Sequence, residues 1–151
     1  MKKKKIMAVA SIGGHWIQLL RITRSLEKDY EVVYLCTHPK CKIMVGEQKF
    51  YLIKNYSRWD AWKAIPSFFQ LLWIIGKEKP TAIITTGAAP GLICLMAGKI
   101  LGRKTIWVES LANVKHLSAS GKIAAMFVSK IYTQWQALAT SRIAFAGNTI
   151  G

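Results

Sequence analysis

Residues 6–15 read IMAVASIGGH, a short apolar run followed by two glycines and a histidine. An uncharged run that ends at a glycine turn is typical of a buried strand. A helical pattern follows at once, with Trp16, Leu19 and Leu20 on one face. The stretch therefore predicts a strand, a tight turn and a helix, which is the opening of a βαβ unit.

The same alternation continues along the chain. Strands are predicted at 31–36, 50–53, 82–85 and 105–108, and helices at 61–75, 92–101 and from about 120 to 131. Near-continuously apolar strands that alternate with helices indicate a parallel sheet covered on both faces. We expect an α/β, Rossmann-like fold in which residues 1–151 form a single domain. Ligands of such sheets bind at the carboxyl ends of the strands.

The chain is strongly basic, with 22 Lys and Arg against 7 Asp and Glu and a formal net charge of +15. Hydrophobic residues make up 52% of it, which excludes a disordered chain. The charge predicts anionic partners, namely phosphates, acidic lipids or nucleic acid. Nucleic acid is disfavoured because no nucleic-acid-binding motif is present. Cys36 and Cys94 lie in apolar runs and are expected to be reduced core residues; no metal or cofactor is predicted.

One uncharged stretch, residues 80–98, approaches the length of a membrane span. Thr85, Thr86 and Gly87 interrupt it, and Pro90 follows closely. A turn exposed to lipid would leave backbone polar groups without partners. A buried strand, a loop and a helix therefore explain this stretch better than a span does.

The first predicted turn carries the residues best suited to chemistry. Gly13 and Gly14, which follow Ser11, let the backbone approach a phosphate beside the free N–H groups of the next helix. Their spacing is not the GxGxxG of nicotinamide-binding proteins. His15 begins that helix, whose positive end favours a neutral imidazole able to accept a proton from a hydroxyl group. The alternative is a histidine that only caps the turn or contacts a phosphate.

Two further loops are expected at the same edge of the sheet. The small residues Gly87, Ala88, Ala89, Pro90 and Gly91 leave room for a bulky group, and a helix N-terminus there suits a diphosphate. Packing alone is the alternative. Glu109, with Ser110 beside it, ends a predicted strand and is placed either to orient a sugar hydroxyl or to pair with a basic neighbour.

Aromatic residues and lysines gather around the predicted helix at 61–75. Such a mixture is typical of a helix that lies in a membrane interface, although about half of the apolar residues are expected to cover the sheet instead. The lysines include Lys54 and Lys63. The proposed membrane-docking side chains are Trp59, Trp62, Phe68, Phe69 and Trp73.

Three segments carry a family resemblance: SIGGH at 11–15, TTGAAPG at 85–91 and VESLANV at 108–114. With them, the sequence resembles the Alg14 and PssD group of glycosyltransferase subunits, which serve dolichol-linked oligosaccharide, capsule and exopolysaccharide synthesis. The chain is also similar to the N-terminal domain of the peptidoglycan lipid-intermediate N-acetylglucosaminyltransferase. The most specific residues of the resemblance are Glu109, Ser110, Leu117, Ser118, Gly121, Lys122, Gln134 and Trp135.

The resemblance implies the N-terminal half of a split GT-B enzyme that is inactive alone. A partner of the Alg13 or PssE kind would bind the UDP-sugar, and this chain would bind a polyprenyl-diphosphate-linked sugar. Gly13, Gly14 and His15 would meet the acceptor phosphates and the reacting hydroxyl, residues 87–91 would lie beside the diphosphate, and Glu109 would face the acceptor sugar.

The resemblance also implies where the protein works. Peripheral attachment to an anionic membrane surface, at the cytoplasmic face of the cell membrane, would rely on the basic and aromatic residues. The main alternative is a non-catalytic membrane scaffold that anchors and activates the partner glycosyltransferase.

Overall fold

The protein is represented by a computed structural model that describes residues 2–56 and 58–149. Its described strands form one sheet in the order β3-β2-β1-β4-β5-β6-β7, and every neighbouring pair is parallel. The strands are β1 (Lys5–Ala10), β2 (Glu31–Cys36), β3 (Lys49–Leu52), β4 (Ala82–Thr85), β5 (Lys104–Val108), β6 (Lys130–Thr133) and β7 (Ile143–Phe145).

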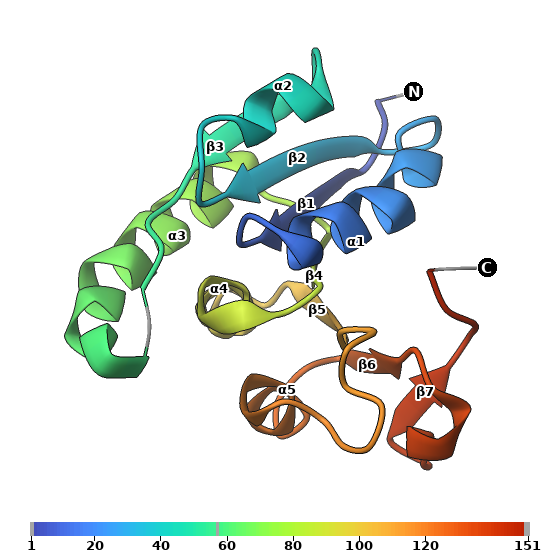
Figure 1. Ribbon diagram of the computed structural model, residues 1–151. Coiled ribbons are helices and arrows are strands. Elements are labelled where there is room, and N and C mark those ends of the chain that lie inside the picture. The colour runs from blue at the N-terminus through green and yellow to red at the C-terminus, as the bar shows by residue number, and fades with distance from the viewer. Residues whose placement is uncertain (1, 57, 150–151) are drawn as a thin grey trace.

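Helices cover both faces of this sheet. Figure 1 shows α4 between α3 and α5, whereas α1 and α2 lie on the other side of the strands. The α-helices are α1 (Gly14–Thr23), α2 (Cys41–Val45), α3 (Ala64–Glu78), α4 (Ala88–Ile100) and α5 (Ala119–Ala124). Short 3₁₀ helices are η1 (Arg24–Leu26), η2 (Arg58–Lys63) and η3 (Gln136–Leu138). The Rossmann-like α/β fold predicted from the sequence is confirmed.

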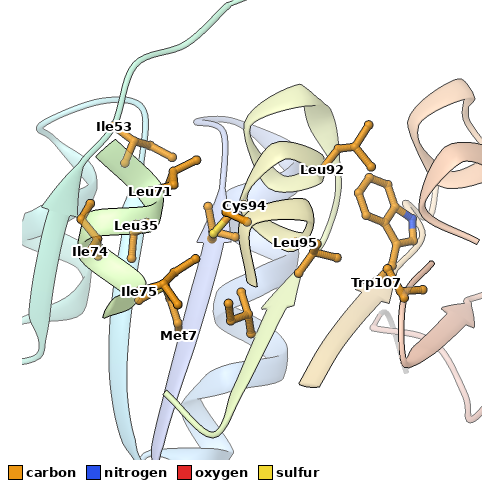
Figure 2. Packing of buried hydrophobic residues seen from close by; sticks show 14 of the residues in the cluster. Met7, Leu35, Ile53, Leu71, Ile74, Ile75, Leu92, Cys94, Leu95 and Trp107 are labelled. Carbon is orange, nitrogen blue, oxygen red and sulfur yellow. The ribbon is translucent and has the colours of Figure 1, made fainter. Parts of the chain in front are cut away.

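Alternation along the strands produces two hydrophobic cores. In β1, Met7 and Val9 pack with α3, α4 and α5, whereas Ala8 and Ala10 pack with α1 and α2. Figure 2 shows the first core, in which Ile75 of α3 and Leu95 of α4 lie against the strands. Each fully buried side chain of this size contributes about 1.5–3 kcal/mol of transfer free energy. The sheet is therefore held from both faces, and its carboxyl edge has a fixed geometry.

The predicted helix at 120–131 is wrong in its second half. Helix α5 ends at Ala124, and Lys130–Thr133 is strand β6, paired with β5. The spacing of Ile123, Phe127 and Ile131 imitates a helical face, but Ile131 and Thr133 are buried with the two-residue period of a strand. Strand β7 was not predicted, because its three residues are too few to show a pattern.

The predicted loop at 87–91 is also wrong beyond Gly87. Ala88 to Gly91 form the first turn of α4, and Pro90 is the third helical residue, where a helix leaves the N–H unused. A Cβ at Gly91 would lie 2.1 Å from Oγ1 of Thr85. Gly91 therefore lets α4 pack closely on β4, which is the packing role that the sequence left open.

The uncharged stretch at 80–98 is divided between β4 and α4. Among the residues that the structure describes, no helix has both the length and the apolar character needed to cross a membrane. Cys36, Cys41 and Cys94 are buried free thiols.

Candidate functional site

The order of the strands in the sheet reverses between β1 and β4. These two strands are parallel neighbours, with Val9 opposite Thr85, and the helices that follow them cover opposite faces. In doubly wound sheets, the loops that diverge at such a point leave a crevice at the carboxyl edge, where ligands bind. The predicted segment at 11–15 and the turn at 86–87, which begins the predicted segment at 87–91, meet at this edge of the sheet, called the crevice from here on.

Two helix N-termini lie at this end of the sheet. Gly13 is the N-cap of α1 with φ 107°, and Gly87 is the N-cap of α4 with φ 131°, both values that favour glycine. Glycine has no side chain to cap the helix, so the first N–H groups of both helices remain available to a ligand. N–H groups of this kind, together with the positive ends of helix dipoles, are in general the groups with which helix N-termini bind anions.

His15 joins the two turns. Its Nδ1 lies 3.0 Å from the carbonyl oxygen of Thr86, and the Thr86 hydroxyl donates to the carbonyl oxygen of His15. Because a carbonyl only accepts, Nδ1 carries the proton in this hydrogen bond. The ring is half-buried against Gly87, where a Cβ would lie 2.8 Å from its Cε1. The geometry therefore orients the imidazole between the two turns, with Nδ1 directed at Thr86.

The remaining predicted residues of the two turns differ in exposure. Ser11 is buried directly after β1, and Gly14 is exposed at the start of α1. Ala88 has a left-handed φ of 69° at the first position of α4, a strained conformation for alanine. Ala88 and Ala89 are half-buried at the crevice, whereas Pro90 is buried beneath it. Pro90, like Gly91, is therefore a buried packing residue in the first turn of α4.

Glu109 does not have the role that was expected. Its side chain is 1% exposed. Oε1 accepts from Ser110 N at 3.1 Å and Asn113 Nδ2 at 2.8 Å. Oε2 accepts from both N and Oγ of Ser118 at 3.1 Å, and Trp107 Nε1 lies 3.4 Å away. The carboxylate therefore has no exposed oxygen for an acceptor sugar; it is a buried anchor for the loop at 110–118.

Two buried glutamines and a tryptophan donate hydrogen bonds to the backbone of this loop. Gln18 Nε2 and Gln134 Nε2 each donate to the carbonyl oxygen of Glu109 at 3.1 Å. Trp135 Nε1 donates to the carbonyl oxygen of Leu111 at 2.8 Å. Gln134 and Trp135, which carry the family resemblance far along the chain, thus meet Glu109 in one network. The sequence reading missed Gln18, whose signal is a polar residue on the apolar face of α1.

A pocket of about 380 Å³ opens between α1 and this loop. Ser110, whose Oγ accepts from Ala112 N, lies in its wall opposite Gly14, so two predicted binding residues share it. Arg21 brings a positive charge and donates to the carbonyl oxygen of Thr149 at 3.3 Å. The other lining residues are Ile17, Gln18, Leu111, Ala112 and Thr149. The pocket is suited to a polar or anionic group that enters beside the α1 N-terminus.

An aromatic stripe runs along η2 and α3, away from the crevice. Trp59, Trp62, Phe69 and Trp73 are 82%, 68%, 63% and 61% exposed, as the membrane-docking prediction requires. Phe68 is the exception: it is half-buried and packs against the core, because it lies on the face of α3 that covers the sheet. Ile65, 63% exposed, extends the same stripe and was missed.

Lysines accompany this stripe. Lys63 Nζ lies 5.5 Å from the centroid of the Trp62 ring, and Lys77 Nζ lies 4.9 Å from that of Trp73. Lysine ammonium groups at the level of exposed indoles are arranged as in helices that rest on acidic lipid headgroups.

Comparison with curated proteins finds relatives that transfer N-acetylglucosamine. The chain is 46% identical over 68 residues to the "UDP-N-acetylglucosamine transferase subunit alg14" of Schizosaccharomyces pombe, covering 40% of this chain and 31% of that protein. It is 27% identical over 162 residues to the corresponding subunit of Yarrowia lipolytica, covering 89% of this chain and 75% of that protein.

A third relative is a bacterial enzyme, the "UDP-N-acetylglucosamine--N-acetylmuramyl-(pentapeptide) pyrophosphoryl-undecaprenol N-acetylglucosamine transferase" of Prochlorococcus marinus. Identity is 25% over 118 residues, covering 72% of this chain and 32% of the enzyme. The chain thus spans about a third of the Schizosaccharomyces and Prochlorococcus proteins.

Solved structures share the fold. MurG of Acinetobacter baumannii matches 96% of this chain with a TM-score of 0.81 at 15% identity, over 46% of its own length. The UDP-GlcNAc 2-epimerase of Methanocaldococcus jannaschii matches 97% of the chain with a TM-score of 0.70 at 17% identity, also over 46% of its length. The predicted likeness to one half of a GT-B protein is confirmed at the level of the fold.

Family membership rests on the region that contains α4 and the Glu109 network. The family model described as "Oligosaccharide biosynthesis protein Alg14 like" matches residues 54–148, which is more than half of the chain. The matched segment includes Gly87, Ser118 and Gln134, which the structure gathers at the carboxyl edge of the sheet. This chain belongs to the Alg14 family.

Proposed function

We propose that this protein is the acceptor-binding subunit of a heteromeric glycosyltransferase that extends a polyprenyl-diphosphate-linked sugar. Residues 1–151 form its single Rossmann-like domain, and a partner of the Alg13 or PssE kind binds the UDP-sugar donor. The observation that carries the proposal is the meeting of two uncapped helix N-termini, at Gly13 and Gly87, with His15 held between them.

The acceptor diphosphate is assigned to the two N-termini. Backbone N–H groups with positive helix ends bind phosphate oxygens without an added cation. The formal net charge of +15 draws such an anion toward the protein. The name of the Prochlorococcus relative includes pyrophosphoryl-undecaprenol, and this supports a lipid diphosphate as the ligand.

His15 is assigned as the general base. Its Nε2 takes the proton of the acceptor hydroxyl while that oxygen attacks the anomeric carbon of the donor sugar. The new glycosidic bond forms as the bond to UDP breaks, and UDP leaves with the electron pair, so the anomeric configuration inverts. The carbonyl oxygen of Thr86, 3.0 Å from Nδ1, orients the ring and stabilises the imidazolium that results.

The aromatic stripe is assigned to the membrane. Trp62, Phe69 and Trp73 enter the headgroup region at the cytoplasmic face, and lysines contact acidic lipid. The protein is then peripheral, held by shallow apolar insertion and by charge. The process it serves is capsule or exopolysaccharide synthesis, in keeping with the resemblance to the PssD group.

The test is sugar transfer by the subunit reconstituted with its donor-binding partner on vesicles that contain the lipid acceptor. His15→Asn removes the base, and we expect the turnover to fall by about 10²–10⁴-fold, the usual contribution of a general base. His116→Asn, a change of the same kind at an exposed histidine of the loop at 110–118, serves as the control. A His15→Asn turnover within about threefold of wild type would instead support the non-catalytic scaffold.

A further inference from the structure

A second, apolar groove of about 610 Å³ lies on the α3–α4–α5 side of the sheet. Its size is within the ~300–1,000 Å³ of small-molecule sites. Nine uncharged residues line it: Tyr56, Ala61, Ala64, Ala89, Leu92, Ile93, Ala119, Ser120 and Ile123. Four of them are alanines, whose small side chains leave the space open.

The lining of this groove reaches both proposed binding regions. Ala89 belongs to the first turn of α4, two residues after the Gly87 N-cap. Ala61 and Ala64, at the junction of η2 and α3, alternate with Trp62 and Ile65 of the exposed stripe. The groove therefore connects the diphosphate site with the surface assigned to the membrane.

We infer that this groove seats the isoprene units next to the diphosphate of the acceptor lipid. The inference rests on the proposed function and adds a path for the lipid. A polyprenyl diphosphate is an uncharged branched hydrocarbon joined to a strong anion, and the order of its parts matches the order of stripe, groove and helix N-termini. A protein partner would need apolar and anionic groups spaced in the order of stripe, groove and helix N-termini, whereas a polyprenyl diphosphate has that order in its covalent structure.

The groove makes the protein prefer a diphosphate that carries a prenyl chain over inorganic diphosphate. Each methylene removed from water contributes about fourfold in affinity. A diphosphate that carries a prenyl chain therefore binds more tightly than inorganic diphosphate. The volume accommodates a short run of isoprene units, and the rest of a long chain continues along the Trp62 stripe into the bilayer.

Binding of two probes to the full chain tests this inference, with farnesyl diphosphate and inorganic diphosphate compared by calorimetry. For wild type, we expect farnesyl diphosphate to bind at least tenfold more tightly. Ala64→Phe and Ala119→Phe fill the groove from opposite walls. Either change should bring the two affinities within about twofold of each other, with the affinity for inorganic diphosphate unchanged. Ala137→Phe, the same change at an exposed alanine that does not line the groove, should keep the preference.

The outcomes separate the inference from the proposed function. Equal affinities in wild type, or a preference that survives in both folded groove variants, would overturn the isoprene groove and leave the diphosphate site intact. Failure of wild type to bind either probe would overturn the diphosphate site and with it the proposed function. Circular dichroism establishes that each variant is folded, and the two variants from separate helices guard against the loss of one.

Discussion

The imidazole of His15 occupies the space that a side chain at residue 87 would need. A Cβ on Gly87 would lie 2.8 Å from Cε1 and 3.0 Å from Nδ1 of His15, closer than real Cβ contacts. The same Nδ1 binds the carbonyl oxygen of the preceding residue, Thr86. The N-cap glycine of α4 therefore leaves the space that the His15 ring of α1 occupies.

Gly87→Ala is expected to displace His15 and lower sugar transfer by the reconstituted complex at least tenfold. It should also reduce the free energy of unfolding by about 1 kcal/mol, because φ at this position is 131°. Gly46→Ala is the matched control, since its φ is 59° and a Cβ there meets nothing within 4 Å. If both variants lose stability equally and both keep full activity, the position of His15 is irrelevant to the reaction.

Glu109→Gln tests whether the buried carboxylate is an anchor. An amide supplies one acceptor oxygen where the carboxylate supplies two, so N–H groups of the loop at 110–118 lose a partner. We expect the free energy of unfolding to fall by about 1–3 kcal/mol, together with faster amide hydrogen exchange in that loop. Glu47→Gln, at an exposed carboxylate, should change neither measurement. Wild-type stability with lost turnover would mean that Glu109 contacts substrate after all.

Glu78 predicts a specific dependence of stability on pH. Burial by itself raises the pKa of this carboxyl, but hydrogen bonds from Lys49, Lys5 and Tyr51 outweigh it and lower the pKa to about 2. The folded-state pKa is thus below the unfolded value near 4.5, so the stabilisation is complete above that value and is lost as the pH falls toward 2.

Glu78→Gln should accordingly cost about 3 kcal/mol at pH 7 and progressively less below pH ~4.5. Urea unfolding of both proteins across this range measures the difference. A difference that stays constant down to the lowest pH at which wild type folds would show that the ion pairs do not cause it.

Neighbouring phenylalanines on α3 should behave in opposite ways. Phe69→Ser removes an exposed ring and is expected to weaken binding to anionic vesicles, while the loss of its edge contact with Phe68 lowers the melting temperature less than Phe68→Ser does. Phe68→Ser removes a ring packed on the core and should lower stability by about 1–3 kcal/mol, less than the loss of a fully buried ring. Vesicle co-sedimentation and thermal unfolding report the two effects. Equal vesicle binding by wild type and Phe69→Ser would contradict membrane docking through this stripe.

The hydroxyl of Tyr56 is buried without a hydrogen-bond partner among the residues that the structure describes. Burial raises the pKa of this phenol, which keeps it neutral and leaves its desolvation uncompensated. Tyr56→Phe should therefore increase the free energy of unfolding by about 1 kcal/mol in chemical denaturation. A loss of stability of similar size would reveal a partner for the hydroxyl.

The strands of the first half were predictable because each is a separate apolar run. Residues 31–36 and 82–85 were assigned with their true ends, since both are buried on two faces and bounded by polar or turn residues. In the second half of the chain, the prediction was wrong where the spacing of apolar residues fitted a helix as well as a strand. Ile123, Phe127 and Ile131 fit one helical face, and pairing of β6 with β5 overrides that local pattern.

The two turns of the candidate site were predictable where backbone chemistry decides them, as at Gly13 and Gly87, which are the N-caps of α1 and α4. The position of Glu109 was not, because a carboxylate at the end of a strand looks alike whether it faces solvent or a ring of N–H donors. The donors that surround it come from Trp107, Asn113 and Ser118, and only the folded loop brings them together. Gln18 was missed although a polar residue on the apolar face of α1 is visible in the sequence, because its partner, the carbonyl oxygen of Glu109, is 91 residues away.

The register of Val9 with Thr85 has a consequence for when the protein becomes able to bind. The turns at Gly13 and Gly87 are more than seventy residues apart in the chain, and they meet only after β1 has paired with β4. Pairings between strands far apart in the chain form late, because the entropy cost of closing the loop comes before the contacts can stabilise it. A nascent chain that has not yet been translated as far as β4 therefore lacks the contact between His15 and Thr86 that joins the two turns.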